Sequence, residues 1–160
     1  MSNGKGRLEG KVSIVTGAGS SGPGVGTGRA MSILFAREGA NVILVDQNLE
    51  SAQETLATIQ AGNGEGLVVQ GDVTRADDCQ KIVEATIAQY GRSDILVHNV
   101  GTAGPDSVVD IDEEYWDRVL NLNLKSVMLM SKFVIPRMAA NGGAVDNQHL
   151  VHRRPTSCGT

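Results

Sequence analysis

The sequence predicts an α/β domain built on a doubly wound parallel sheet, and three observations lead to this prediction. Short β-branched runs alternate with amphipathic segments of helical length over the first 140 residues. Six glycines gather between residues 17 and 28, where the first strand-like run gives way to the first helical pattern. Helical crossovers of this length join parallel strands in a right-handed sense and cover the sheet on both faces.

The individual elements follow from local patterns. Strands are predicted for four short apolar runs, at 11–16, 41–45, 66–70 and 94–98. Helices are predicted for 29–37, for the segment that Asn48 can cap, for 75–90 and for 114–138. Gly39 and Gly91 follow the first and third of these helical patterns and are expected to end them.

No fifth strand is predicted after the long helix. Beyond residue 144 the sequence shows no apolar alternation, and four basic or imidazole side chains lie close together: His149, His152, Arg153 and Arg154. A buried strand with this content would hold charges without partners, which is costly. We therefore expect an incomplete sheet within a domain at 1–144, with the strand at 94–98 as an unpaired edge, and a disordered tail at 145–160.

Composition and charge exclude several classes of protein. The chain is 41% apolar and 20% charged, as globular proteins are. A net charge of −4 argues against a nucleic-acid-binding protein that neutralises phosphates, and two cysteines are too few for a disulfide framework. No apolar run approaches the ~20 residues that span a bilayer, and no secretory signal is evident. We expect a cytoplasmic protein without a nucleic-acid partner, a membrane partner or a metal site.

The glycine-rich segment 16–28, TGAGSSGPGVGTG, predicts a phosphate-binding turn. Glycines allow a tight turn and the close approach of a diphosphate, and the helix that follows offers unpaired N–H groups at its positive end. Asp46 closes the second strand, where a carboxylate can accept hydrogen bonds from an adenosine ribose. These features favour a Rossmann-like dinucleotide-binding fold. Two plainer interpretations stay open: the glycines form only a flexible connection, and Asp46 is only a turn residue.

Two other classes of nucleotide-binding protein also use a glycine-rich turn. A P-loop NTPase needs lysine after the last glycine, whereas Gly28 is followed by Arg29 and Ala30. A methyltransferase usually places an acidic residue just ahead of the glycines, where this chain has Val15 and Thr16. The methyltransferase therefore stays as a disfavoured alternative, and the P-loop is excluded.

Four short sequence motifs follow one another along the chain. Thr16-Gly17 with Gly26-x-Gly28 is followed by GDVT at 71–74, by DILVHNVG at 94–101 and by WDRVLNLNLK at 116–125. Together they resemble the motifs of the short-chain dehydrogenases/reductases, with a glycine turn lengthened by five residues. His98 and Val100 depart from that family's DILVNNAG, and Asn123 matches the asparagine of its catalytic tetrad.

The resemblance implies hydride transfer between a nicotinamide dinucleotide and a small alcohol or carbonyl compound. It implies cofactor contacts at the ends of the strands, from Gly17, Ser20, Ser21, Gly26, Gly28, Asp46, Asp72, Val73, Asn99 and Gly101. It also implies a catalytic role for Asn123 and self-association through the helix at 114–138. The residues by themselves allow plainer roles: a strand end for Asp72, a tether between strands for Asn99 and a structural amide for Asn123.

NAD is favoured over NADP on electrostatic grounds. Asp46 would repel a 2′-phosphate, and such a phosphate needs an arginine or lysine nearby. Residues 17–28 contain no basic side chain, and neutral Gln47 follows Asp46.

The catalytic serine and the Tyr-x-x-x-Lys pair of the family are not found in these 160 residues. Tyr90 and Tyr115 are the two tyrosines, and neither has a lysine four residues later. One back-translation of residues 147–160, read one nucleotide later, resembles the family's next strand, so a truncation or frameshift after about residue 144 is our hypothesis. We expect the chain to be inactive alone and to bind cofactor weakly. The alternative is a non-catalytic nucleotide-binding or interaction module.

Overall fold

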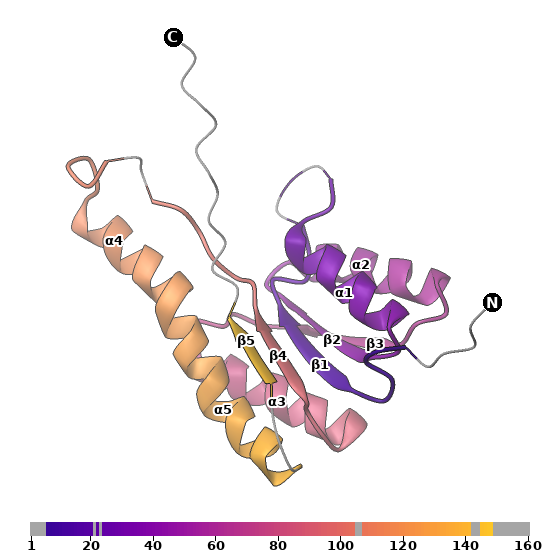
Figure 1. Ribbon diagram of the computed structural model, residues 1–160. Helices are drawn as coiled ribbons and strands as arrows, with labels where there is room; N and C mark the ends of the chain where they lie inside the picture. Colours follow the sequence, from indigo (N-terminus) through magenta and orange to yellow (C-terminus); the bar gives the residue numbers. More distant parts are fainter. Residues whose placement is uncertain (1–5, 21, 23, 105–106, 142–144, 149–160) are drawn as a thin grey trace.

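The computed structural model describes residues 6–20, 22, 24–104, 107–141 and 145–148. Within them, five parallel strands form one sheet in the order β3-β2-β1-β4-β5 (Figure 1). The strands are β1 (Val12–Thr16), β2 (Asn41–Asp46), β3 (Gly66–Gln70), β4 (Ile95–His98) and β5 (Val145–Gln148). The α-helices are α1 (Thr27–Arg37), α2 (Leu49–Ala61), α3 (Ala76–Tyr90), α4 (Glu113–Leu120) and α5 (Ser126–Ala140). The predicted Rossmann-like, doubly wound parallel sheet is confirmed.

Side chains alternate between the two faces of the sheet and build two cores. Ile14 of β1 packs with residues of α3 and α5, whereas the next residue, Val15, packs on the side of α1 and α2. Ile43 and Leu44 of β2 divide in the same way, and all four side chains are fully buried. Burial of each such side chain contributes about 1.5–3 kcal/mol, so the alternation holds the helices in two layers.

The fifth strand corrects the expectation that β4 is an unpaired edge and that a disordered tail begins at residue 145. β5 pairs in parallel with β4, from Ile95 opposite Val145 to His98 opposite Gln148. Backbone hydrogen bonds in a sheet do not require apolar side chains, so a polar segment can pair with the open edge of β4. The rest of the predicted tail, 149–160, lies outside the described residues.

The long helix expected at 114–138 is a helical segment over 113–140, but its middle is not α-helical. A π-helical turn, η1 (Asn121–Lys125), lies between α4 and α5. π-Helical turns inside α-helices are rare, and those that occur often lie at functional sites.

Among the described helices, none is long and apolar enough to cross a membrane.

The carboxylate of Asp94 joins the start of β1 to the start of β4. Its Oδ2 accepts a hydrogen bond from the backbone N–H of Val12 at 2.9 Å, and its Oδ1 lies 3.7 Å from Lys11 Nζ. The Arg92 guanidinium donates to both carboxylate oxygens. Burial raises the pKa of Asp94, but the bonds from Arg92 and Val12 outweigh burial and hold the pKa below its usual value.

The substitution Asp94→Ala should lower the free energy of unfolding by about 1–3 kcal/mol, because the buried N–H of Val12 loses its acceptor. A carboxylate with a depressed folded-state pKa stabilises the fold above its unfolded-state pKa of about 4, and this stabilisation is lost as the pH falls through the folded-state pKa. The difference in stability between the unchanged chain and D94A should therefore shrink as the pH is lowered from about 6 toward 3. Urea unfolding at several pH values measures it.

The matched control is Asp110→Ala, which removes an exposed carboxylate from a turn. This variant should unfold like the unchanged chain at every pH. A stability difference for D94A that stays constant down to acid pH would contradict the role assigned to the Asp94 charge.

Candidate functional site

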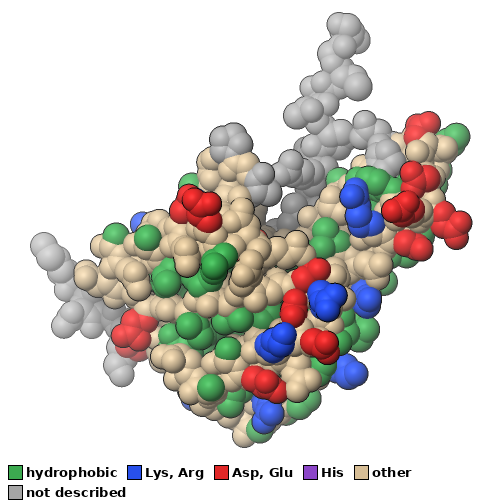
Figure 2. Space-filling model, turned by 180° about the vertical axis from the view of Figure 1, so that it is seen from behind, with side chains coloured by type: hydrophobic (Ala, Val, Ile, Leu, Met, Phe, Trp, Pro, Cys, Tyr) green, Lys and Arg blue, Asp and Glu red, His purple; other side chains and the backbone are tan. Residues whose placement is uncertain are grey.

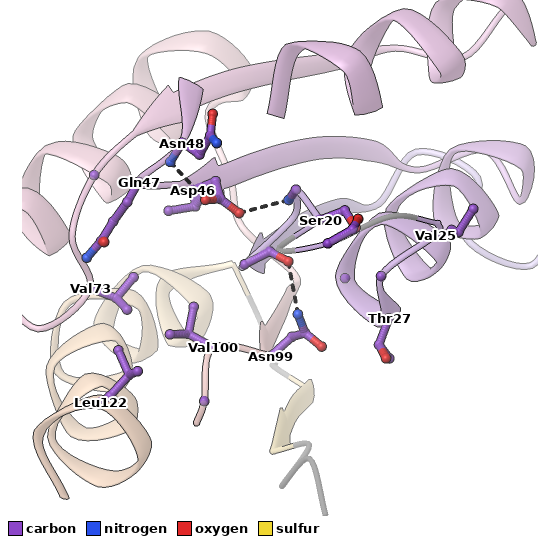
Figure 3. Close-up of a pocket in the computed structure, with 18 residues that line it drawn as sticks. Ser20, Val25, Thr27, Asp46, Gln47, Asn48, Val73, Asn99, Val100 and Leu122 are labelled. Atoms are coloured by element: carbon purple, nitrogen blue, oxygen red, sulfur yellow. Dashed lines mark hydrogen bonds between the residues drawn. The ribbon is translucent and has the colours of Figure 1, made fainter. Parts of the chain in front are cut away.

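A cleft of about 700 Å³ opens at the carboxyl ends of β1, β2 and β4, beside the N-terminus of α1 (Figure 3). β2 and β4 flank β1, so the chain moves outward in opposite directions from this point of the sheet. Doubly wound sheets bind their ligands at such a switch point. Eight of the predicted cofactor contacts line the cleft: Gly17, Ser20, Gly26, Gly28, Asp46, Val73, Asn99 and Gly101.

Three predicted residues remain. Ser21 is outside the described residues. Asp72 lies between Gly71 and Val73, which both line the cleft, but it is not itself among the lining residues. Asn123 is not among the lining residues either, whereas its neighbour Leu122 is.

The glycine turn brings the N-terminus of α1 against the end of β1. Gly17 has φ of +66°, a conformation that side chains other than glycine rarely adopt. A Cβ atom on Gly28 would overlap the carbonyl oxygen of Gly17, so no other residue type fits there without movement of the backbone. This close packing leaves the first turn of α1 facing the cleft.

The N-terminus of α1 is suited to an anion. Its N-cap, Gly26, provides no side-chain hydrogen bond, and its first turn contains no acidic residue. N–H groups in the first turn of a helix have no acceptor within the helix, and the helix dipole makes this end positive. A diphosphate is the group that such an end commonly binds.

Asp46 is held by the backbone on both sides. Its Oδ2 accepts from the N–H of Gly19 at 2.9 Å, and its Oδ1 accepts from the N–H of Asn48 at 2.9 Å. Figure 3 shows the carboxylate between the glycine turn and the start of α2. A carboxylate in this fixed place can accept hydrogen bonds from the hydroxyls of a ribose.

Asp72 is turned toward its own loop. Its Oδ1 accepts from the N–H and the hydroxyl of Thr74, at 2.8 and 2.7 Å. Burial raises the pKa of Asp72, but the bonds from Thr74 and from the Gln47 side chain outweigh burial and lower the pKa below its usual value. The carboxylate is therefore ionised and orders the segment that carries Val73 to the cleft.

Asn99 ties the end of β4 to the glycine turn, as its plainer role predicts. Its Nδ2 donates to the carbonyl oxygen of Gly17 at 2.9 Å, and its backbone N–H donates to Thr16 Oγ1 at 3.2 Å. Its Oδ1 is buried and has no hydrogen-bond partner among the described residues. A buried acceptor without a partner is costly.

Both polar atoms of the Asn123 amide bond the loop after β4. Its Oδ1 accepts from the N–H of Thr102 at 2.8 Å, and its Nδ2 donates to the carbonyl oxygen of Thr102 at 2.7 Å. A Cβ atom on Gly101 would lie 2.8 Å from Asn123 Oδ1, so Gly101 allows this approach. The π-helical turn thereby holds the cleft wall in place.

Sequence reasoning missed several residues of the cleft. Val100 and Leu122 add an apolar wall opposite the glycine turn, and Gln47 and Asn48 extend the wall beyond Asp46 (Figure 3). Gln47 and Asn48 follow β2, and Val100 follows β4. Their places just after strands are the signal that could have identified these three residues. Leu122 had no such signal, because only the packing of η1 brings it to the cleft.

The residues fit a dinucleotide. An uncapped helix end can bind the diphosphate, and Asp46 can bind the ribose. Val73 and Val100 also line the cleft, and their apolar side chains can contact a planar ring.

Comparison with known proteins agrees with this geometry. The sequence profile described as short chain dehydrogenase matches residues 11–147. The chain is 37% identical over 147 residues to the 3-oxoacyl-acyl-carrier-protein reductase of Thermotoga maritima, covering 91% of this chain and 58% of that protein. The chain spans about half the length of the curated relatives it matches.

Solved structures agree as well. A protein from Burkholderia xenovorans described as a short-chain dehydrogenase/reductase superposes with a TM-score of 0.86 at 45% identity, over 89% of this chain and 57% of that one. A 7α-hydroxysteroid dehydrogenase in complex with NADH and 7-oxo glycochenodeoxycholic acid superposes with a TM-score of 0.83 at 34% identity, over 92% and 56%. The chain therefore belongs to the short-chain dehydrogenase family, oxidoreductases that bind a nicotinamide dinucleotide.

Proposed function

We propose that this chain is the cofactor-binding portion of an NAD-dependent dehydrogenase/reductase that oxidises a small alcohol or reduces a carbonyl compound. The observation that carries the proposal is the carboxylate of Asp46, fixed beside a glycine turn and an uncapped helix end. The ADP-ribose half of the cofactor would lie along these groups. When bound, the nicotinamide ring supplies or accepts the hydride.

Electrostatics supports NAD over NADP. Asp46 cannot swing away from an added 2′-phosphate without losing its two backbone hydrogen bonds. The guanidinium of Arg29, in the first turn of α1, is already paired with Glu54 at 2.7 Å. A 2′-phosphate would thus meet a fixed negative charge and no free cation among these residues.

We propose that neither the tyrosines nor Asn123 of this chain carries out the proton-transfer step. Tyr115 donates its hydroxyl to the carbonyl oxygen of Ala103 and has Val119, not lysine, four residues later. The amide of Asn123 positions the loop after β4 and has no proton to transfer. We therefore propose that this chain alone binds cofactor weakly and does not turn over substrate.

Titration of the chain with ADP-ribose, NAD and NADP tests the choice of cofactor. ADP-ribose and NAD should bind with dissociation constants within about threefold of each other, because few described groups are left for the nicotinamide half. NADP should bind at least about tenfold more weakly, because its 2′-phosphate lies beside Asp46. Amide shifts in NMR spectra measure all three affinities.

S-Adenosylmethionine serves as the control ligand in the same titration. Its binding in the absence of any NAD binding would favour the methyltransferase alternative. Equal affinity for NAD and NADP would contradict the cofactor assignment.

The substitution Gly28→Ala should weaken NAD binding more than tenfold and lower the free energy of unfolding by about 1–3 kcal/mol, because its methyl group would overlap Gly17. Gly22→Ala is the matched control in the same turn, since a Cβ there meets nothing within 4 Å. Calorimetry and urea unfolding measure the two effects. A G28A variant with unchanged affinity would show that the α1 end does not bind the cofactor.

We also propose that a second copy of the chain covers the long helical segment. Apolar side chains spaced four residues apart are exposed along it: Trp116 at 47%, Leu120 at 39%, Leu124 at 64% and Met128 at 52%. Its first half carries Glu113, Glu114 and Asp117 after the N-cap Asp112, with Arg118 as its one cation, and its second half carries Lys125, Lys132 and Arg137 without an acidic residue. Figure 2 shows one group of acidic side chains at the end of the molecule on the upper right. Antiparallel pairing of two copies would set each acidic half against a basic half.

The substitution Leu124→Asp should therefore raise the dissociation constant of the dimer more than about tenfold, because it places a charge in the centre of the apolar stripe. Val109→Asp is the control, since Val109 is 87% exposed and lies outside the helical segment. Sedimentation velocity over a range of concentrations measures association. A chain that stays monomeric at every concentration would contradict self-association through this face.

A further inference from the structure

The outer side of the glycine turn is hydrogen-bonded to α2 through one serine. The N–H of Ser20 donates to Ser51 Oγ at 2.7 Å, and the Ser51 hydroxyl donates to the carbonyl oxygen of Ser20 at 3.2 Å. One side chain thus bonds both backbone polar groups of a turn residue. Ser51 is buried, so water competes little for these bonds.

Two further side chains adjoin Ser51. Thr55, one turn further along α2 and fully buried, donates from Oγ1 to the carbonyl oxygen of Ala18 at 2.9 Å. Arg29 of α1 donates from Nε to Thr55 Oγ1 and from its terminal nitrogen to the carbonyl oxygen of Ser51, both at 3.0 Å. We name Arg29, Ser51 and Thr55 the Ser51 cluster.

The Ser51 cluster lies behind the wall of the cleft. None of its three members is among the residues that line the cleft, whereas Gly19 and Ser20 are. A Cβ atom on Gly19 would lie 2.7 Å from Ser51 Oγ, so the turn packs directly on the cluster. The Ser51 hydroxyl can therefore affect a bound ligand through the position of the turn.

The composition of the turn makes such bonds important. Residues 17–28 contain six glycines, and glycine loses more conformational freedom on ordering than any other residue. A binding loop that is already ordered does not have to lose this freedom when the ligand binds.

We infer that Ser51 is a positioning residue for the dinucleotide site. Its hydroxyl orders the glycine turn, so its loss weakens binding although no ligand contact is removed. The inference rests on the proposed function for the identity of the ligand. The ordering of the turn does not depend on any ligand, so the two can be tested separately.

The experiment compares Ser51→Ala, which removes the hydroxyl, with Ser51→Thr, which keeps it. Thr58→Ala is the matched control, because Thr58 is an exposed residue of α2 whose hydroxyl bonds the backbone oxygen of Glu54. Amide hydrogen exchange measured by NMR reports the order of Ser20, and exchange at Ile14 in β1 reports the stability of the whole fold. Titration with ADP-ribose reports binding.

In S51A, exchange at Ser20 should be about tenfold faster with unchanged exchange at Ile14, and affinity for ADP-ribose should be about five- to tenfold lower. S51T should restore both properties, and T58A should change neither. Equal acceleration at Ser20 and Ile14 would mean loss of global stability and would overturn the inference.

Faster exchange at Ser20 with undiminished affinity for ADP-ribose would also overturn it. Absence of ADP-ribose binding by the chain without substitutions would contradict the proposed function. Exchange at Ser20 that is no faster in S51A would refute the role of Ser51, whatever ligand the chain binds.

Discussion

The close approach of α1 to the end of β1 is the contact on which the rest of the site depends. Gly28 meets the carbonyl oxygen of Gly17, and Asn99 bonds the same oxygen from the end of β4. The end of β1, the start of α1 and the end of the sequence-distant β4 are thus joined at one peptide group. Because no side chain fits between them, the positive end of α1 faces the cleft at the switch point of the sheet.

The two cores explain why this contact is stable. The apolar residues of β1 and β2 alternate between the α1–α2 side and the α3–α5 side, and both layers press on the same central strands. Asp94 adds a buried bond that joins the starts of β1 and β4, at the opposite end of the strands from the cleft. The central strands are therefore held at both ends, and the loops that leave their carboxyl ends have defined starting points.

The polar groups around the cleft divide into those that face it and those that order its wall. Asp46 and the N-terminus of α1 face the cleft. Asp72, Asn123 and Ser51 bond backbone groups of the adjacent loops instead. Matching of motifs to a family assigns Asp72 and Asn123 to the cofactor and to catalysis, whereas their bonds in this structure are those of residues that hold loops in position. Binding sites commonly combine residues that face the ligand with others whose hydrogen bonds hold the surrounding loops in position.

The sequence by itself determined the strands β1 to β4, the helices between them, the glycine turn and the place of Asp46. These features follow from local periodicity, from glycine positions and from the rule that parallel strands end at one edge. Only the tertiary structure decided that residues 145–148 pair with β4, because that pairing uses backbone groups that no side-chain pattern records. It also decided the π-helical turn that brings Leu122 to the cleft and the bonds from Ser51 to Ser20, because these depend on which residues of separate elements meet in space.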